Sequence, residues 1–512
     1  MPSAQITVST PSARPASLFQ NTVAQSAPKL LAYVFSFLSA PVIVQGIGLR
    51  LFGIWALTGA LAQYGALLDL GVGVSLARYV AANQDNRRLC GEYMTIGWLS
   101  VAAIAAVLGP LALVGAAFMS RTLGGISVHD MRIVLCASVA LLCCSMLQSV
   151  IIAYPIGLRR MVVPNIGLAI SAAFNFVASV GSILLGAGLP GYAVANAGAG
   201  VAGVVIIAVL VLRAEGRLPL AVPERGRLRT FLEFSFKNQL VRLMSLVNYQ
   251  TDKIVIAFSV GPQAAGAYEL ANRVALAFRE VGVYAISAVN IELTSIMTRL
   301  GMGRVRQRYR RLNEVTAALT LPPVILAIAT APLLLEAWLG HAPPNSTAVL
   351  VGLSVAYLAG ASTGVGYAVA IAAGEPGIVA RTSVGTGLVN ILLTAGLAPV
   401  FGLWGVLAGT VVALTGGAIA QVILVQRRFA LPARDYVDAV VPALRTYLLL
   451  ALPVLVFCYT NPIHGRVAQA IALVVVCVLY MAACTAWALR AGRLPAAITN
   501  RLAATGWLRA PA

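Results

Sequence analysis

Seven charged side chains lie in a stretch that is otherwise apolar enough to cross a membrane as two helices, from Asn238 to Glu280: Arg242, Asp252, Lys253, Glu269, Arg273, Arg279 and Glu280. Charge inside a bilayer is costly and is kept mainly where it faces a bundle interior or a watery cavity. The cations there could bind phosphate oxygens, and the carboxylates could carry a coupled proton or cation.

The spacing of these residues places them on faces. On the first helix, polar residues recur at four- and three-residue steps: Asn238, Arg242, Ser245, Tyr249 and Asp252. On the second, Glu269, Arg273 and Glu280 share a face, and Glu269 with Arg273 forms an i,i+4 pair. Two polar faces predict a lined cavity. The alternative is a set of ion pairs that only lock helices together.

The composition indicates a polytopic membrane protein. Of 512 residues, 60% are hydrophobic and 10% charged, whereas soluble domains are about 45–50% apolar and about 25% charged. The net charge of +20 comes from basic residues placed between apolar runs, which makes them topology signals and argues against nucleic-acid binding. The cysteines and histidines show no metal-ligand spacing, and there is no nucleotide-binding loop. We therefore expect no catalytic residue, metal, cofactor or enzymatic activity.

About fourteen apolar segments are long enough to span a bilayer. They are predicted near 29–48, 54–82, 94–119, 132–154, 162–187, 190–212, 231–258, 264–297, 312–338, 346–373, 379–400, 403–426, 440–460 and 467–489. The fold class is therefore all-α and polytopic. With a cytoplasmic N-terminus, about 26 Lys and Arg residues fall in inner loops and tails, which predicts that both termini are cytoplasmic.

The sequence contains an internal repeat. Phe52-Gly53-Ile54-Trp55-Ala56-Leu57 recurs as Ala265-Gly266-Ala267-Tyr268-Glu269-Leu270, at an offset of 266 − 53 = 213. Gly188 and Gly402 begin similar turns at 402 − 188 = 214, and Asn175 and Asn390 match at 390 − 175 = 215. An even number of spans per repeat predicts two parallel, pseudo-symmetric six-helix lobes and two additional helices. The predicted units are a mobile cytoplasmic tail (1–28), the first lobe (29–213), a cytoplasmic link (214–230), the second lobe (231–428) and the two added helices with a tail (429–512).

Several motifs carry a family resemblance. They are Leu49 to Leu57, Leu68-Asp69-Leu70-Gly71-Val72-Gly73, Ala77-Arg78-Tyr79-Val80-Ala81, Tyr249 to Ile256 and Gly266 to Ala271. In this order they resemble the bacterial polysaccharide transporters of the multidrug/oligosaccharidyl-lipid/polysaccharide exporter superfamily. The resemblance implies a flippase in the bacterial inner membrane, carrying polyprenyl-diphosphate-linked oligosaccharide to the outer leaflet. It also implies a V-shaped, often cationic cavity between the lobes.

This resemblance gives the charged residues candidate roles. The hypothesised diphosphate contacts are Arg78, Arg242, Lys253, Arg273 and Arg279, and the candidate coupling acids are Asp69, Asp252, Glu269 and Glu280. Structural interpretations stay open: Arg78 near the end of its span can reach the headgroups, Lys253 can neutralise Asp252, and Glu269 with Arg273 can be a structural pair. Amide and aromatic residues such as Asn175 and Asn390 are candidate sugar contacts or helix–helix hydrogen bonds.

Three other functions remain alternatives. A multidrug/cation antiporter of the same superfamily would favour carboxylates in the cavity, whereas arginines are at least as numerous here. A flippase of the peptidoglycan precursor would recognise the same lipid diphosphate. A membrane glycosyltransferase or polymerase would need a large outer loop, which this sequence lacks. The expected partners are the lipid-linked oligosaccharide and membrane lipids, with cooperation of a polysaccharide polymerase left open.

Overall fold

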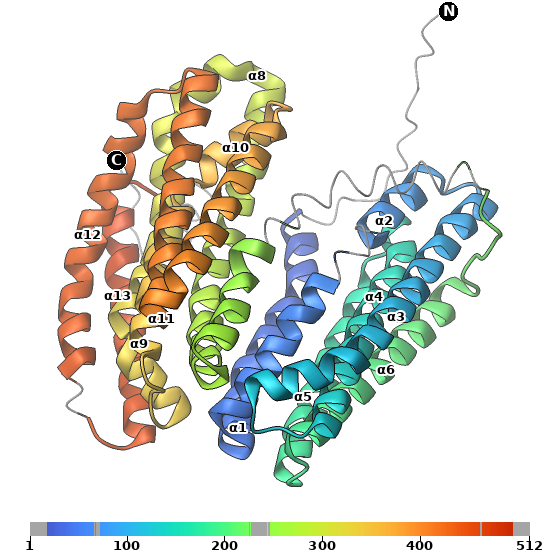
Figure 1. The fold of residues 1–512 in the computed structure, drawn as a ribbon. Coiled ribbons are helices and arrows are strands. Elements are labelled where there is room, and N and C mark those ends of the chain that lie inside the picture. Colours follow the sequence, from blue (N-terminus) through green and yellow to red (C-terminus); the bar gives the residue numbers. More distant parts are fainter. Residues whose placement is uncertain are drawn as a thin grey trace, which may run out of the picture.

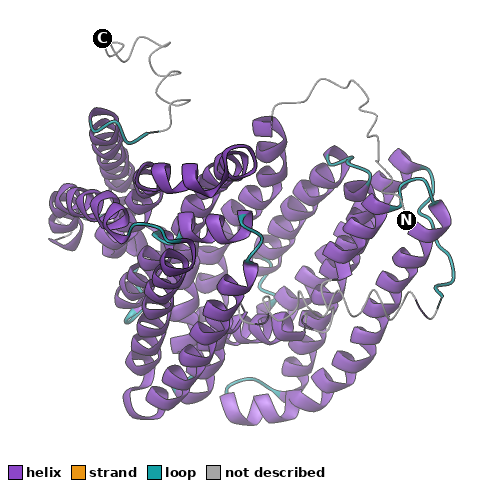
Figure 2. Ribbon diagram, turned by 90° about the horizontal axis from the view of Figure 1, so that it is seen from above, coloured by secondary structure: helices purple, strands orange, loops and turns teal. Residues whose placement is uncertain are grey.

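The computed structural model describes residues 18–65, 67, 72–224, 226, 243, 246–460 and 463–494, and in this part of the chain every regular element is helical (Figures 1 and 2). The helices are α1 (Leu18–Gly65), α2 (Val72–Ala82), α3 (Arg87–Leu123), α4 (Val128–Gly157), α5 (Val162–Leu184), α6 (Gly188–Glu215), α8 (Pro262–Leu339), α9 (Ser346–Ala361), α10 (Gly364–Ala372), α11 (Pro376–Phe429), α12 (Ala433–Thr460) and α13 (Arg466–Arg490). The predicted all-α fold is confirmed.

Three of these helices are too long for one crossing. α1, α8 and α11 contain 48, 78 and 54 residues, and at about 1.5 Å per residue each far exceeds a hydrocarbon core of about 30 Å. Each is interrupted by a glycine at positive φ: Gly48 (φ 81°), Gly301 (φ 74°) and Gly402 (φ 55°). Only glycine adopts such angles readily, so the chain reverses there.

These breaks explain why fewer helices than predicted spans are seen. By length and composition, nine described helices could cross a membrane, or ten when the bent pair α9–α10 is one span. Dividing α1, α8 and α11 at their glycines, and including helical residues 246–259, agrees with the prediction of about fourteen. One boundary differs: α1 begins at Leu18, eleven residues before the predicted first span at 29 (29 − 18 = 11).

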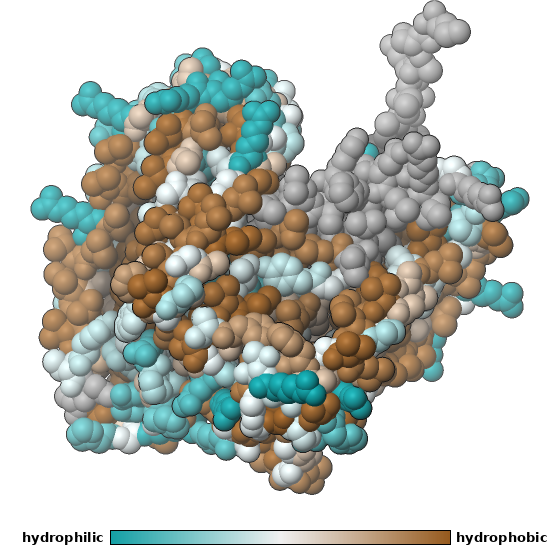
Figure 3. Space-filling model, viewed as in Figure 1, coloured by the Kyte–Doolittle hydropathy of each residue, from teal (hydrophilic) through white to brown (hydrophobic). Residues whose placement is uncertain are grey.

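The helices form two bundles that lie close at one end and splay at the other (Figure 1). The first bundle holds α1 to α6, and the second holds residues 246–259 with α8 to α11. α12 and α13 pack chiefly on α8 of the second bundle. Apolar side chains cover the flanks of the helices, as expected of surfaces that face lipid (Figure 3).

The repeat is visible in the geometry. Gly48 and Gly261, 213 residues apart (261 − 48), both have positive φ, as do Gly188 and Gly402, 214 apart. A Cβ atom on Gly203 would lie 2.1 Å from the Ser171 hydroxyl, and one on Gly417 would lie 1.9 Å from the Thr386 hydroxyl. Both bundles therefore use a glycine opposite a hydroxyl residue to bring two helices close together.

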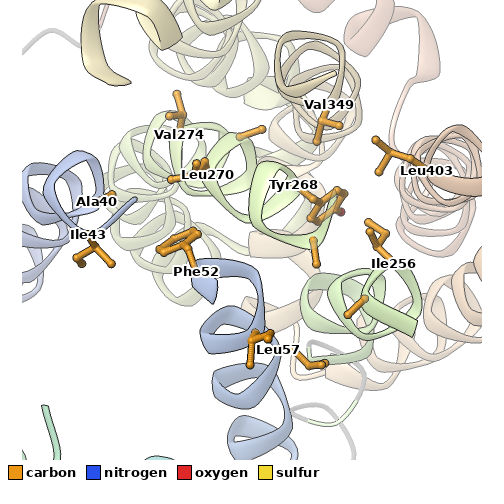
Figure 4. Packing of buried hydrophobic residues seen from close by; sticks show 14 of the residues in the cluster. Ala40, Ile43, Phe52, Leu57, Ile256, Tyr268, Leu270, Val274, Val349 and Leu403 are labelled. Carbon is orange, nitrogen blue, oxygen red and sulfur yellow. The ribbon is translucent and has the colours of Figure 1, made fainter. Parts of the chain in front are cut away.

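The bundles meet at the end that carries Gly48 and Gly261, here called the Gly48 end. A Cβ atom on Gly53 would lie 1.8 Å from the Pro262 carbonyl oxygen, and one on Gly266 would lie 2.4 Å from the Leu49 carbonyl oxygen. The two helices thus touch backbone to backbone. Around this crossing, Phe52 and Leu57 of α1 pack in one core with Tyr268 and Leu270 of α8 (Figure 4).

Candidate functional site

Polar side chains of α1 bond side chains of the second bundle. Arg273 Nη1 donates to Ser36 Oγ (3.2 Å), Gln250 Nε2 donates to Gln63 Oε1 (3.2 Å), and Tyr64 bonds Thr251 between hydroxyl oxygens 2.5 Å apart. Ser36 and Arg273 are each twelve residues from the glycine break of their repeat (48 − 36 and 273 − 261). At 1.5 Å per residue this is about 18 Å from the Gly48 end, near the middle of a bilayer.

Next to this junction lies a buried ion cluster. Glu269 binds Lys253 Nζ (2.5 Å) through one carboxylate oxygen and Arg273 Nε (2.8 Å) through the other. The side chains of Lys253 and Glu269 are only 7% and 10% exposed. The predicted i,i+4 pair of Glu269 with Arg273 is present, but the salt bridge of Lys253 is to Glu269 and not to Asp252. The carboxylate compensates the buried charge of Lys253, and the cluster keeps a net charge of +1 that falls to Arg273, whose side chain is 25% exposed.

Asp252 is held by hydroxyl groups. The side chain is buried, and its Oδ2 accepts hydrogen bonds from the Tyr268 hydroxyl and from Thr410 Oγ1 (2.8 Å). Thr410 Oγ1 also lies 3.3 Å from Asn390 Oδ1. Within the described residues, Asp252 Oδ1 and Asn390 Nδ2 have no hydrogen-bond partner, and Asp252 makes no salt bridge. This group of four side chains therefore contains a carboxylate with one oxygen left to bind something else.

Arg279 lines a cavity of about 200 Å³ in the second bundle. Its guanidinium bonds Glu280 Oε1 (2.8 Å) and lies over the rings of Tyr249 and Tyr357, 4.8 and 5.8 Å from their centroids. The rest of the polar lining is uncharged: Asn248, Thr363, Thr382, Ser383, Thr386 and Gln421. Arginine over aromatic faces keeps its charge while part of its hydration is removed, and its free donors can reach an anion.

A second cavity, of about 480 Å³, lies mainly in the first bundle. Helices α1, α4, α5 and α6 form its walls, and Arg273 of α8 reaches it from the second bundle. Arg273 is the one charged residue among its described lining. Neither this cavity nor the Arg279 cavity is lined by a carboxylate of the described residues.

The remaining predicted site residues lie elsewhere. Arg78 is on α2, is exposed, and lines neither cavity. Arg242 and Asp69 lie outside the described residues. Of the residues that now belong to the site, Thr410 and Tyr357 carry no charge and were not singled out as site candidates. The internal repeat could have pointed to Thr410, because this residue follows Asn390, which the repeat already marks, by 20 positions. In the described residues, no three His, Cys, Asp or Glu side chains could hold a metal ion together.

Comparison with known proteins agrees with this architecture. Residues 18–291, more than half of the chain, match the model of a family described as "Polysaccharide biosynthesis protein". No curated protein sequence is significantly similar to the chain.

Solved structures share the fold at low sequence identity. One is the lipid II flippase MurJ in an inward closed conformation, with a TM-score of 0.70 and 14% identity, covering 92% of this chain and 99% of that one. Another is an inward-facing multidrug resistance MATE family transporter of the MOP superfamily, with a TM-score of 0.60 and 14% identity, covering 79% and 94%. A mutant of the Vibrio cholerae MATE transporter VcmN has a TM-score of 0.54 and 18% identity, covering 82% and 97%.

Proposed function

Since the chain belongs to the polysaccharide biosynthesis protein family, whose members' model it matches over residues 18–291, we propose that it is a flippase for a polyprenyl-diphosphate-linked oligosaccharide. In this proposal it moves the lipid from the inner to the outer leaflet of a bacterial inner membrane, by alternating access between the two bundles. The arginine-rich connections and both termini face the cytoplasm, so the splayed end is the inner one.

The charge of the cavities is the observation that carries this proposal. Arg273 lines one cavity and Arg279 the other, and no described carboxylate lines either. A lipid diphosphate needs fixed cations in a site of low dielectric constant, and arginine can bind two of its oxygens at once. A cation antiporter needs the opposite charge. We assign diphosphate contact to Arg279 first, because among the described residues its guanidinium bonds one side chain, Glu280, whereas that of Arg273 bonds two, Glu269 and Ser36.

Deletion of the protein followed by leaflet-resolved analysis of lipid-linked saccharides tests the proposal. We expect complete carrier-linked units to accumulate on the inner leaflet, and wild type to relieve the accumulation. Arg279→Ala should lower the rate at which the accumulated lipid leaves the inner leaflet at least tenfold. The reason is that charge-assisted hydrogen bonds contribute about 1.5–3 kcal/mol each. Arg434→Ala, which removes a 91% exposed arginine side chain, is the matched control. Normal leaflet distribution with raised sensitivity to cationic drugs would favour the antiporter instead.

The similarity of the fold to the lipid II flippase MurJ makes a peptidoglycan-precursor flippase the second candidate. Both candidates require a lipid diphosphate, so the arginines do not separate them. The headgroup of the lipid that accumulates does: a peptide-bearing disaccharide would identify the second candidate, and a peptide-free glycan the first.

Among the candidate acids, we assign coupling to Asp252. Glu269 is neutralised by Lys253 and Arg273, and Glu280 by Arg279, whereas Asp252 has only hydroxyl partners among the described residues. In proteoliposomes, Asp252→Asn should transport at the same rate with and without an imposed ion gradient, while wild type is accelerated by one. Equal acceleration of both proteins would remove Asp252 from this role.

A further inference from the structure

The cavity of the first bundle has a lining suited to a neutral, hydroxyl-rich ligand. Asn175 lines it and makes no hydrogen bond with any described residue, so its amide is available on both its donor and acceptor sides. Ser179 Oγ donates to Asn196 Oδ1 (3.0 Å) at the wall. Aromatic rings complete it: Trp55 packs edge-on against Tyr192 (centroids 5.0 Å apart), and Phe35 stacks on Phe176 (4.9 Å).

The internal repeat identifies the place in the second bundle that is equivalent to this cavity. The Asp252 group of the second bundle consists of Asp252, Tyr268, Asn390 and Thr410. Subtracting the repeat offsets gives 252 − 213 = 39, 268 − 213 = 55, 390 − 215 = 175 and 410 − 214 = 196. The equivalent residues are Ser39, Trp55, Asn175 and Asn196, and all four line the first-bundle cavity.

The two equivalent places therefore differ in charge. Where the second bundle has the buried carboxylate of Asp252, the first has the hydroxyl of Ser39. Where the second bundle has the ion pair of Lys253 and Glu269, the same offset of 213 leads to Ala40 and Ala56 (253 − 213 and 269 − 213). Without a carboxylate in its described lining, the first-bundle cavity has no negative charge to attract a metal ion or an organic cation. With the amide of Asn175, which makes no hydrogen bond with a described residue, the cavity is also unsuited to a lipid tail.

We propose that this cavity is a saccharide subsite, which binds one uncharged sugar residue of the lipid-linked substrate. This inference rests on the proposed function. Amides and hydroxyls bond the sugar hydroxyls, and the faces of Trp55 and Phe176 contact its C–H groups. The volume of about 480 Å³ lies within the usual range of small-ligand sites. Arg273, which lines the cavity from the second bundle, adds a cation that could bond a diphosphate oxygen next to the sugar.

Binding of two probes to the purified full-length protein tests this assignment. The probes are undecaprenyl diphosphate without sugar, and the carrier-linked saccharides extracted from cells that lack the protein. Their affinities are compared by native mass spectrometry. Wild type should bind the saccharide-bearing lipid more tightly than the bare one. Asn175→Ala should weaken binding of the saccharide-bearing lipid about fivefold, the usual effect of one neutral hydrogen bond, and leave bare-lipid binding unchanged.

Asn165→Ala is the matched control. Asn165 is on the same helix α5 as Asn175 but lines neither cavity, and its Nδ2 has no hydrogen-bond partner among the described residues. The substitution should change neither affinity. Equal binding of both lipids by wild type, or equal weakening of both by Asn175→Ala, would overturn the saccharide subsite while leaving the flippase proposal standing. Failure of wild type to bind either lipid would overturn both proposals together.

Discussion

A methyl group at the crossing of the two bundles should shift the protein away from the conformation described here. In Gly53→Ala the new Cβ would lie 1.8 Å from the Pro262 carbonyl oxygen and 2.9 Å from the Gly266 nitrogen. Ordinary van der Waals contact begins at 3.4 Å, so α1 and α8 must separate by about 1.6 Å (3.4 − 1.8) at this point. Both opposing atoms are backbone, and no side-chain rotation can relieve the clash.

Overpacking of this kind costs about 1–3 kcal/mol. Because the cost falls only on the state in which the bundles touch at the Gly48 end, the population of any state open at that end should rise by a factor of about 5 to 150. Spin labels at two exposed positions of that end, His129 on the first bundle and His341 on the second, report the change as a longer distance in a cysteine-free background.

Gly59→Ala is the control, since a Cβ at Gly59 would meet no atom within 4 Å. It should reproduce the wild-type distance distribution. The reasoning would be refuted if Gly53→Ala also gave the wild-type distribution and an unchanged melting temperature, because the backbone contact would then not limit the approach of the bundles.

Further predictions concern contacts of different burial. Glu269→Gln should lower stability by about 3–5 kcal/mol, because it leaves the buried Lys253 and the partly buried Arg273 without their counter-charge; thermal unfolding in detergent measures this, and an unchanged melting temperature would contradict it. Trp338→Phe removes the hydrogen bond to the Phe37 carbonyl oxygen (2.8 Å) and should destabilise the touching state by about 1 kcal/mol. The same spin-label distances should then lengthen, as expected for Gly53→Ala. Arg428→Ala should leave the melting temperature unchanged despite a bidentate pair with Glu375 (both 2.7 Å), because that pair is exposed and screened by solvent.

Much of the fold follows from local properties of the sequence. Apolar length predicts the spans, and the turns at Gly188 and Gly402, identified from the repeat, carry the left-handed angles that only glycine adopts easily. The merging of spans into α1, α8 and α11 was not predicted, because hydropathy does not show whether a reversal occurs in a loop or at one residue. The start of α1 at Leu18 was also missed, since the preceding polar composition does not resemble a span.

The site was predictable only where its contacts are local. The pair of Glu269 with Arg273 follows from four-residue spacing, whereas the salt bridge of Lys253 to Glu269 depends on how two helices align after the turn at Gly261. The hydroxyl partners of Asp252 come from residues 16 and 158 positions away. Such partners carry no charge signal, and only tertiary packing brings them together.

The attachment of α12 and α13 to α8 makes the two halves of the molecule unequal in the plane of the membrane. Drag in a bilayer grows with the size of the body that must displace lipid, and the half that carries α12 and α13 is the larger one. In the alternating access that we propose, the half without α12 and α13 should therefore swing further relative to the surrounding lipid. The bilayer would then deform mostly beside α3, α5 and α6, and little beside the C-terminal pair.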